Sequence, residues 1–208
     1  MIKLVIVDDD TIIREGLRMI METQDDLEIV GICSNGKDAI KVCREQIPDV
    51  VLLDIRMPEM SGIEVAKVVL EENIGKPLLL TTFDEPDLMI QAVKTNVSGY
   101  ILKSSPAKTI LSAIRTVSCG GTVFEKEVID YISSNLGMTT VKSKLFDELT
   151  DREYDVARLI SQGLSNKEIG EKLFISDGTV RNHITSILSK TSLEHRTQIA
   201  IQFLSSSH

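Results

Sequence analysis

Carboxylates gather at two places in the chain, each at the end of a short apolar run. Asp8, Asp9 and Asp10 follow the run LVIV near the N-terminus, and Asp54 ends the run VVLL. An aspartate carboxylate can act as a nucleophile and accept a phosphoryl group as an aspartyl phosphate. Neighbouring acids can hold Mg²⁺, which binds one or two carboxylates together with water and phosphate oxygens. These residues indicate magnesium-dependent phosphorylation of Asp54, if the fold brings them together.

Two further side chains would complete such a site. Thr81 ends the run PLLL and Lys103 ends the run YIL, so a hydroxyl and an ammonium group could meet the phosphoryl oxygens. Taken singly, each residue has an ordinary explanation: Asp10 alone is typical of a helix N-cap, and Lys103 alone is typical of a solvated surface. Asp54 alone also resembles the acidic strand of a nucleotide hydrolase, but the chain has no G-x-x-x-x-G-K-[ST] phosphate loop.

The first 120 residues alternate between two kinds of segment. Amphipathic helical patterns lie near 11–22, 36–46, 62–73, 85–95 and 106–118, and strand-like apolar runs occupy Lys3–Val7, Leu27–Cys33, Val50–Leu53, Pro77–Leu80 and Gly99–Leu102. Five β-then-α units predict a doubly wound α/β domain with a five-stranded parallel sheet. Ligands of such sheets bind outside the carboxyl ends of the strands. We therefore expect one edge of the sheet to collect Asp8, Asp54, Thr81 and Lys103.

The chain from Leu149 onward has a helical pattern without strand-like runs. The segments Thr150–Glu153 and Ser165–Glu168 have the T/S-x-x-E form of a capping box, which begins a helix. Ser176 can cap a third helix from about Gly178 to Lys190. Two short helices joined by a tight turn, with another packed behind them, predict an all-α helix-turn-helix domain.

The third of these helices has a polar face that could contact DNA. Its members are Thr179, Arg181, Asn182, Thr185 and Ser186. Arginine and asparagine suit bidentate contacts to guanine and adenine, although an isolated helix with such a face could simply be solvated. The net charge of −8, with nine acidic and seven basic side chains in residues 147–208, excludes a non-specific coat for nucleic acid. Any DNA contact must come from a local face and would gain from dimerisation, which doubles the phosphate contacts.

Between the two domains the pattern weakens. Residues 121–146 are predicted to form a linker with a possible short helix near 125–135. No apolar run approaches the roughly 18 residues of a membrane span, and the N-terminal run is too short for a signal peptide. Cys33, Cys43 and Cys119 have no metal-ligand spacing and are typical of free thiols in a reducing compartment. We expect a cytoplasmic protein without a membrane partner.

Four segments resemble the signatures of response-regulator receiver domains. They are VIVDDD, DVVLLDIRMPEMSG, LLLTTF and GYILKSSP, and they follow the family's order and spacing over about residues 1–120. The resemblance implies the flavodoxin-like strand order 2-1-3-4-5 and Asp54 as the phosphoacceptor. It implies that Mg²⁺ is held by Asp8, Asp9, Asp54 and the backbone carbonyl of Arg56.

The same resemblance assigns the remaining receiver residues. Lys103 matches the phosphate-binding lysine, and Thr81 and Tyr100 match the switch hydroxyl and the switch aromatic residue. Arg56 and Phe83, two residues after Asp54 and Thr81, flank the path of attacking water and are expected to modulate dephosphorylation. Ser104 departs from the proline that often follows the lysine.

The segment QGLSNKEIGEKLFISDGTVRNHI resembles the LuxR-type helix-turn-helix, and the whole chain is similar to the NarL/FixJ family of two-component response regulators. The implied division is a receiver at 1–120, a linker at 121–146 and a DNA-binding domain at 147–208. The implied partners are a cognate sensor histidine kinase, inverted-repeat promoter DNA and, after phosphorylation, a second copy of the chain. The DNA contacts are expected from Asn166, Lys167, Thr179, Arg181, Asn182, Thr185 and Lys190.

Two other functions remain as alternatives. A stand-alone aspartyl-phosphate hydrolase or phosphotransferase would need a D-x-D pair, whereas Asp54 is followed by Ile55-Arg56. A regulator controlled by a small molecule or partner protein, without phosphorylation, would have no need for the set of acids, Thr81 and Lys103. We therefore expect a phosphorylation-dependent transcription regulator that catalyses only its own phosphoryl transfer and dephosphorylation.

Overall fold

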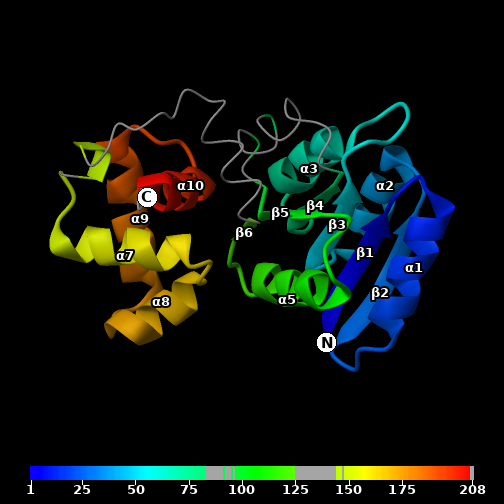
Figure 1. Cartoon of the computed structure of the whole chain (residues 1–208), viewed down its shortest axis with the longest axis horizontal. Helices are drawn as coiled ribbons and strands as arrows, with labels where there is room; N and C mark the ends of the chain where they lie inside the picture. Colours follow the sequence, from blue (N-terminus) through cyan, green and yellow to red (C-terminus); the bar gives the residue numbers. More distant parts are fainter. Residues whose placement is uncertain (83–90, 92–94, 96, 125–143, 147, 207–208) are drawn as a thin grey trace. The chain divides into compact units, whose positions relative to one another are not determined.

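The computed structural model describes residues 1–82, 91, 95, 97–124, 144–146 and 148–206 (Figure 1). The chain divides into two compact units, Met1–Ser118 and Cys119–His208. Among the described residues, no helix combines the length and the apolar character needed to cross a membrane.

A parallel sheet forms the centre of the first unit. Its strands are β1 (Ile2–Val7), β2 (Leu27–Cys33), β3 (Val50–Asp54), β4 (Pro77–Thr81) and β5 (Gly99–Leu102). The order is β2-β1-β3-β4-β5, which confirms the predicted topology, and a two-residue strand, β6 (Val123–Phe124), follows β5 in the sheet. Strand β6 was not predicted, because those residues were assigned to the linker.

The central strands are buried on both faces. The apolar residues of β1, β3 and β4 from Leu4–Val7, Val50–Leu53 and Leu78–Leu80 are at most 1% exposed. Continuous apolar runs of this kind are typical of parallel strands covered by helices on both sides. Figure 1 shows these helices, which are α1 (Thr11–Glu22), α2 (Gly36–Gln46), α3 (Gly62–Glu71) and α5 (Ala107–Ser118). The helix expected near 85–95 lies largely outside the described residues.

Local caps fix where the helices begin beside the sheet edge. The carboxylate of Asp10 accepts hydrogen bonds from the backbone N–H groups of Ile12 and Ile13, at 2.8 and 3.2 Å, and begins α1 as predicted. Ser61 and Glu64 form a capping box at the start of α3. These caps satisfy N–H groups that have no partner inside the helix, so the loop after each acidic strand leads directly into a helix.

The second unit contains η1 (Lys144–Phe146), α7 (Asp151–Ser161), α8 (Asn166–Leu173), α9 (Asp177–Thr191) and α10 (Arg196–Ser206). Both predicted capping boxes are present, at Thr150 and Ser165. Helix α8 ends at Phe174, whose φ of 56° is left-handed, and α9 begins after Ser176. A Cβ on Gly170 would lie 2.7 Å from the Ile175 carbonyl, so glycine lets the turn approach α8 closely. Helices α7, α8, α9 and α10 share one core, which includes Val156, Ile160, Ile169, Val180, Ile187, Ile199 and Phe203.

Candidate functional site

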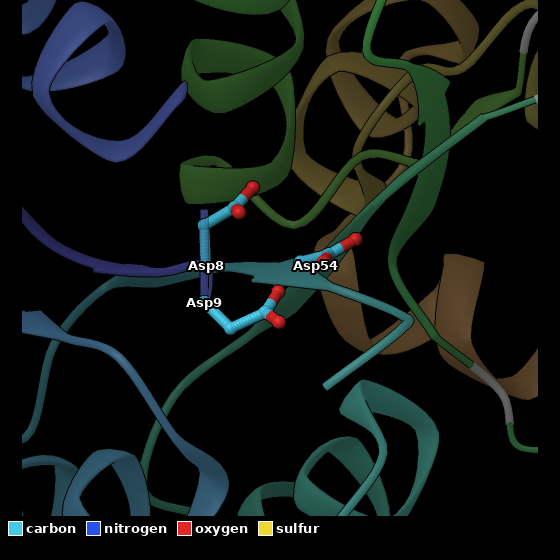
Figure 2. Close-up of side chains that lie close together, drawn as sticks. All are labelled: Asp8, Asp9 and Asp54. Carbon is cyan, nitrogen blue, oxygen red and sulfur yellow. The ribbon is translucent and has the colours of Figure 1, made fainter. Parts of the chain in front are cut away.

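Three carboxylates converge at the carboxyl edge of the sheet. Asp8 follows β1 and Asp54 ends β3; the two strands are parallel neighbours, with Val7 opposite Leu53. One carboxylate oxygen from each of Asp8, Asp9 and Asp54 lies within 4.8 Å of the others (Figure 2). Asp8 and Asp54 are buried, whereas Asp9 is exposed. The structure thus brings together acids that stand about 46 residues apart because two adjacent parallel strands end at the same edge.

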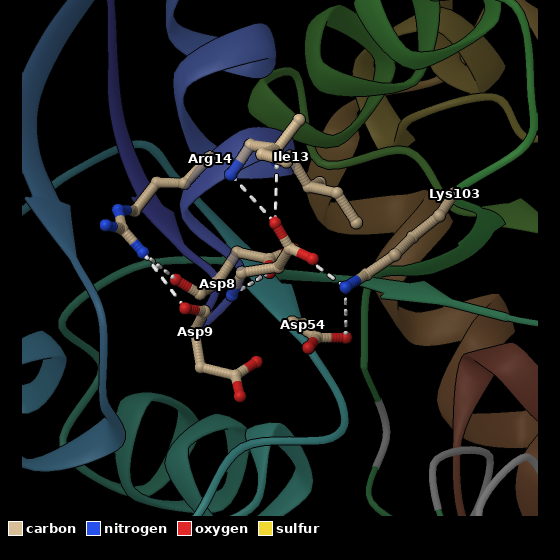
Figure 3. Close-up of polar contacts among 8 residues, drawn as sticks. Asp8, Asp9, Ile13, Arg14, Asp54 and Lys103 are labelled. Carbon is tan, nitrogen blue, oxygen red and sulfur yellow. Dashed lines mark hydrogen bonds and ion pairs between the residues drawn. The ribbon is translucent and has the colours of Figure 1, made fainter.

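Lys103 connects the two buried acids. Its Nζ lies 2.8 Å from Asp8 Oδ2 and 2.9 Å from Asp54 Oδ1 (Figure 3). The backbone N–H of Lys103 donates to the Thr81 carbonyl at 2.7 Å, which ties the ends of β5 and β4 together. Burial disfavours the charged ammonium, but the carboxylates of Asp8 and Asp54 outweigh burial and raise the pKa of Lys103. The lysine is therefore a fixed cation beside Asp54.

The environment of Asp54 makes it less acidic than an exposed aspartate. Burial is the main cause, and the negative charge of Asp8 adds to it, so that the pKa of Asp54 is raised to about 6. Lys103 and the backbone N–H of Arg56 act in the opposite direction. The site therefore concentrates negative charge that one ammonium group only partly balances.

The acid cluster fits a hard dication. Asp8 Oδ1 accepts a hydrogen bond from the Asp10 N–H at 2.9 Å. Asp8 Oδ2 is buried and touches Lys103 as an ion pair, but it has no hydrogen bond of favourable geometry within the described part of the chain. Three carboxylates facing one ammonium leave uncompensated charge and free oxygen lone pairs. Carboxylate oxygens are the ligands that Mg²⁺ prefers, so Asp8, Asp9 and Asp54 could hold this ion.

A glycine allows the loop after β3 to close beside Asp54. A Cβ on Gly62 would lie 2.1 Å from the Asp54 backbone oxygen, a separation that real structures do not show. The Gly62 N–H donates to the Ile55 carbonyl at 2.9 Å, and the Ile55 N–H donates to the Leu80 carbonyl at 3.2 Å. The segment that carries Asp54 is therefore held between β4 and the start of α3.

The two predicted switch residues lie at the ends of neighbouring strands. Thr81, 2% exposed, donates its hydroxyl to the Thr82 carbonyl at 2.8 Å. Tyr100 is fully buried, so its ring is already inside the protein. Burial raises the pKa of Tyr100 to about 12, with nearby Thr81 opposing the shift, yet the Tyr100 hydroxyl has no hydrogen bond of favourable geometry among the described residues. Phe83, the predicted modulator of dephosphorylation, lies outside the described residues.

Helix α9 presents several of the predicted DNA contacts to solvent. Arg181, Asn182 and Thr185 are exposed, and Lys167 is exposed at the start of α8. Arg181 pairs with Asp177 at 2.7 Å, in the i,i+4 arrangement of an exposed helix pair. Such pairs contribute about 0.3–0.5 kcal/mol, so Arg181 can leave Asp177 at little cost. Thr179 is half-buried and shares a hydrogen bond with Ser176.

Other predicted contacts are engaged inside the domain. Lys190 pairs with Glu153 at 2.7 Å, and Ser186 donates to the same carboxylate at 2.6 Å. The expectation that Ser186 lies on the exposed face is wrong, because it is half-buried against this carboxylate of α7. Asn166 accepts a hydrogen bond from Arg196 at 2.6 Å, which ties the start of α8 to α10.

The role of Glu153 was not anticipated beyond its capping box. Glu153 is 5% exposed, and its carboxylate also accepts hydrogen bonds from the N–H and hydroxyl groups of Thr150, at 2.8 and 3.0 Å. Burial acts to raise the pKa of Glu153, but the bonds from Lys190, Ser186 and Thr150 outweigh it and lower the pKa to about 2. One carboxylate therefore caps α7 and also holds α9.

Two family models match the chain. The response regulator receiver domain matches residues 4–115, and the luxR family of bacterial regulatory proteins matches residues 147–203. The transcriptional regulatory proteins LnrK and LiaR of Bacillus subtilis (strain 168) are 39% and 38% identical over 97% of this chain and 96% of their own length. The response regulator protein VraR of Staphylococcus aureus is 37% identical over 96% of this chain and 95% of its own length.

Solved structures agree with this assignment. The response regulator ChrA of a heme-sensing two-component system covers 99% of this chain and 98% of its own, with 29% identity and a TM-score of 0.58. A LuxR-family DNA-binding response regulator from Staphylococcus aureus covers 57% of this chain and 99% of its own, with 32% identity and a TM-score of 0.54.

A receiver sheet with an acidic edge, together with a LuxR-type helix-turn-helix, defines a DNA-binding response regulator of a two-component system. The chain is therefore a transcription regulator. It belongs to the LuxR-type response regulators of the NarL/FixJ family, as the four sequence segments and the helix-turn-helix motif predicted.

Proposed function

We propose that Asp54 accepts a phosphoryl group in a magnesium-dependent reaction, and that this modification promotes dimerisation and binding of α9 to inverted-repeat promoter DNA. The observation that carries the first part is the contact of Lys103 with both Asp8 and Asp54 in a cluster of three carboxylates. The family membership points to a separate sensor histidine kinase as the donor.

In this mechanism an Asp54 carboxylate oxygen attacks phosphorus and displaces the donor's leaving group, an imidazole nitrogen or, from acetyl phosphate, acetate. Asp8, Asp9, Asp54 and the backbone carbonyl of Arg56 would hold Mg²⁺. The chemistry that the bound ion supplies is neutralisation of charge on the phosphoryl oxygens. Lys103 is already beside Asp54 Oδ1 and needs only to exchange one oxygen for another to bind the product.

The switch then acts through the ends of β4 and β5. A phosphoryl oxygen at Asp54 would draw the Thr81 hydroxyl away from the Thr82 carbonyl, and the space beside it would favour the inward position of the Tyr100 ring. Phosphorylation would thereby bias an existing equilibrium between two arrangements. Arg56 and Phe83 are proposed to set how fast water removes the phosphoryl group.

The DNA contacts are proposed to come from the exposed residues of the helix-turn-helix. Arg181, Asn182 and Thr185, with Thr179, would read bases from the major groove, and Lys167 would contact a phosphate. Contact by Lys190 or Asn166 would first require exchange of their bonds to Glu153 and Arg196. This cost is larger than that of opening the exposed pair of Arg181 and Asp177.

The phosphorylation proposal can be tested with acetyl phosphate and intact-mass spectrometry. Wild-type protein should gain one phosphoryl group with Mg²⁺ and none with a chelator, and peptide mapping should place it on Asp54. Asp54→Ala should remain unlabelled. Asp25→Ala is the matched control, because Asp25 is exposed just before β2, at the opposite edge of the sheet, and should be labelled normally. A label that persists in Asp54→Ala would refute the assignment.

Dimerisation and DNA binding need a separate measurement. Phosphorylated full-length protein should sediment as a dimer and select an inverted repeat from random duplexes, whereas unphosphorylated protein should do so poorly. An unchanged sedimentation coefficient after full labelling would contradict control through dimerisation.

A further inference from the structure

Arg14 lies behind the acid cluster and binds the backbone that carries it. One guanidinium nitrogen, Nη1, donates to the Asp8 carbonyl at 2.7 Å and reaches the Asp9 carbonyl at 3.4 Å. The other, Nη2, donates to the Thr11 hydroxyl at 3.2 Å. Figure 3 shows Arg14 approaching the main chain of Asp8 and Asp9, while Lys103 approaches the Asp8 carboxylate from another side. No sequence motif indicates a role for Arg14.

The carbonyls that Arg14 binds are outside the hydrogen-bond ladder of α1. The first N–H groups of the helix reach Asp10: Ile12 and Ile13 donate to its carboxylate, and the Arg14 N–H donates to its carbonyl at 3.0 Å. The cap therefore fixes Asp10, and the Asp10 N–H is bound to Asp8 Oδ1, whereas the carbonyls of Asp8 and Asp9 are bound by Arg14. The planar, forked guanidinium suits the task of holding adjacent carbonyls in a fixed relation.

We propose that Arg14 is a positioning residue for the cation site, which it supports by fixing the backbone of Asp8 and Asp9 so that their carboxylates face Asp54. This inference rests on the proposed magnesium-dependent function. Arg14 acts through Asp8 and Asp9 and contacts neither the cation nor the phosphoryl donor. Partners of metal ligands commonly affect metal affinity about 10- to 100-fold, because they orient the ligands.

Electrostatics and positioning predict opposite effects of removing Arg14. A guanidinium is a positive charge near the site and repels a dication, so loss of charge alone would tighten cation binding. Loss of positioning would weaken cation binding, because the two carboxylates would no longer be held towards Asp54. The sign of the change in affinity therefore distinguishes the two roles.

The test is Mn²⁺ binding to the unphosphorylated full-length protein, followed by electron paramagnetic resonance of the free ion. Arg14→Met keeps the aliphatic stem and should weaken Mn²⁺ binding by about tenfold. Arg14→Lys keeps the charge but not the fork, and should lie between Arg14→Met and wild type. Arg18→Met is the matched control: Arg18 lies one turn later on α1 and pairs with Glu15 and Glu22, so its loss should leave the affinity unchanged.

A second readout separates positioning from a general defect. The rate of labelling by acetyl phosphate should need more Mg²⁺ for half-maximal effect in Arg14→Met, and it should reach the wild-type maximum when Mg²⁺ saturates. Mn²⁺ binding by Arg14→Met that equals or exceeds that of wild type would overturn the inference. If Arg14→Met does not fold, Arg14→Lys carries the test, and wild-type affinity in that variant is the overturning result. Failure of wild-type protein to bind Mn²⁺ would instead contradict the proposed function itself.

Discussion

The carboxylate of Glu153 should be a major source of stability in the DNA-binding unit. Its folded-state pKa of about 2 lies below the ordinary value of 4.5. At about 1.36 kcal/mol for each pKa unit, the ionised carboxylate contributes about 3 kcal/mol to the free energy of unfolding at neutral pH. Because the pKa is depressed, this contribution is complete above about pH 4.5 and is lost as the pH falls through about 2. At pH 3 about 1.4 kcal/mol should remain.

We expect Glu153→Gln to remove most of this contribution. A neutral amide cannot form the ion pair with Lys190, and its NH₂ group would face donors from Ser186 and Thr150. The free energy of unfolding should fall by about 3 kcal/mol at pH 7, because the bonds that lower the pKa of Glu153 are lost with its charge. Near pH 3 the difference in free energy of unfolding between the variant and wild type should shrink to about half, because the Glu153 carboxylate of the wild type then contributes less.

The assay is pulsed hydrogen exchange of the full-length protein along a urea series, with α7 and α9 peptides read by mass spectrometry. These peptides report the DNA-binding unit separately from the receiver. A double-mutant cycle with Lys190→Met isolates the pair, for which a hydrogen bond to a charged group predicts about 1.5–3 kcal/mol of coupling. The exposed pair of Arg158 and Asp155 is the control, with an expected coupling below about 1 kcal/mol. A pH-independent difference, or equal coupling in both pairs, would refute the reasoning.

Three further substitutions test the two sites. Gly62→Ala should push the Asp54 loop away, because the added Cβ would lie 2.1 Å from the Asp54 backbone oxygen. We expect slower labelling by acetyl phosphate and a free energy of unfolding about 1–3 kcal/mol lower. Labelling at the wild-type rate would contradict this expectation. Thr81→Ala should still be labelled, but its DNA affinity, measured by fluorescence anisotropy, should no longer respond to phosphorylation. Arg181→Ala should weaken binding by about 1–3 kcal/mol and relax sequence preference if Arg181 reads a base, whereas a uniform loss on all duplexes would indicate a phosphate contact. Arg158→Ala, an exposed charge on α7, is the control for this variant.

Features set by short stretches of chain could be predicted from the sequence. The parallel sheet and the meeting of Asp8, Asp54 and Lys103 followed from apolar runs that end in polar residues, since parallel strands share an edge, whereas the strand order came from the family resemblance. The capping boxes at Thr150 and Ser165 depend only on residues three positions apart. Both kinds of signal are local, and the structure contains them.

Features that depend on packing between distant segments could not be predicted. The spacing of Ser186 in its helix places it on the predicted exposed face, but its hydroxyl donates to the carboxylate of Glu153, 33 residues earlier in the chain. Lys190 is likewise engaged by a carboxylate 37 residues away. The contacts of Arg14 involve backbone carbonyls, which carry no side-chain signal in the sequence.

The buried hydroxyl of Tyr100 affects how far phosphorylation can raise the output of the regulator. Under the proposed switch, a chain that holds its ring inward in a fraction f of molecules before any signal can increase its output at most 1/f-fold. A buried hydroxyl without a hydrogen bond of favourable geometry, such as that of Tyr100 among the described residues, costs about 1–3 kcal/mol, which would lower the inward population by a factor of about 5 to 150. Under the proposed switch, this cost would suppress background output and widen the dynamic range of the regulator. Tyr100→Phe would remove that penalty, raise the basal output and compress the response to the stimulus.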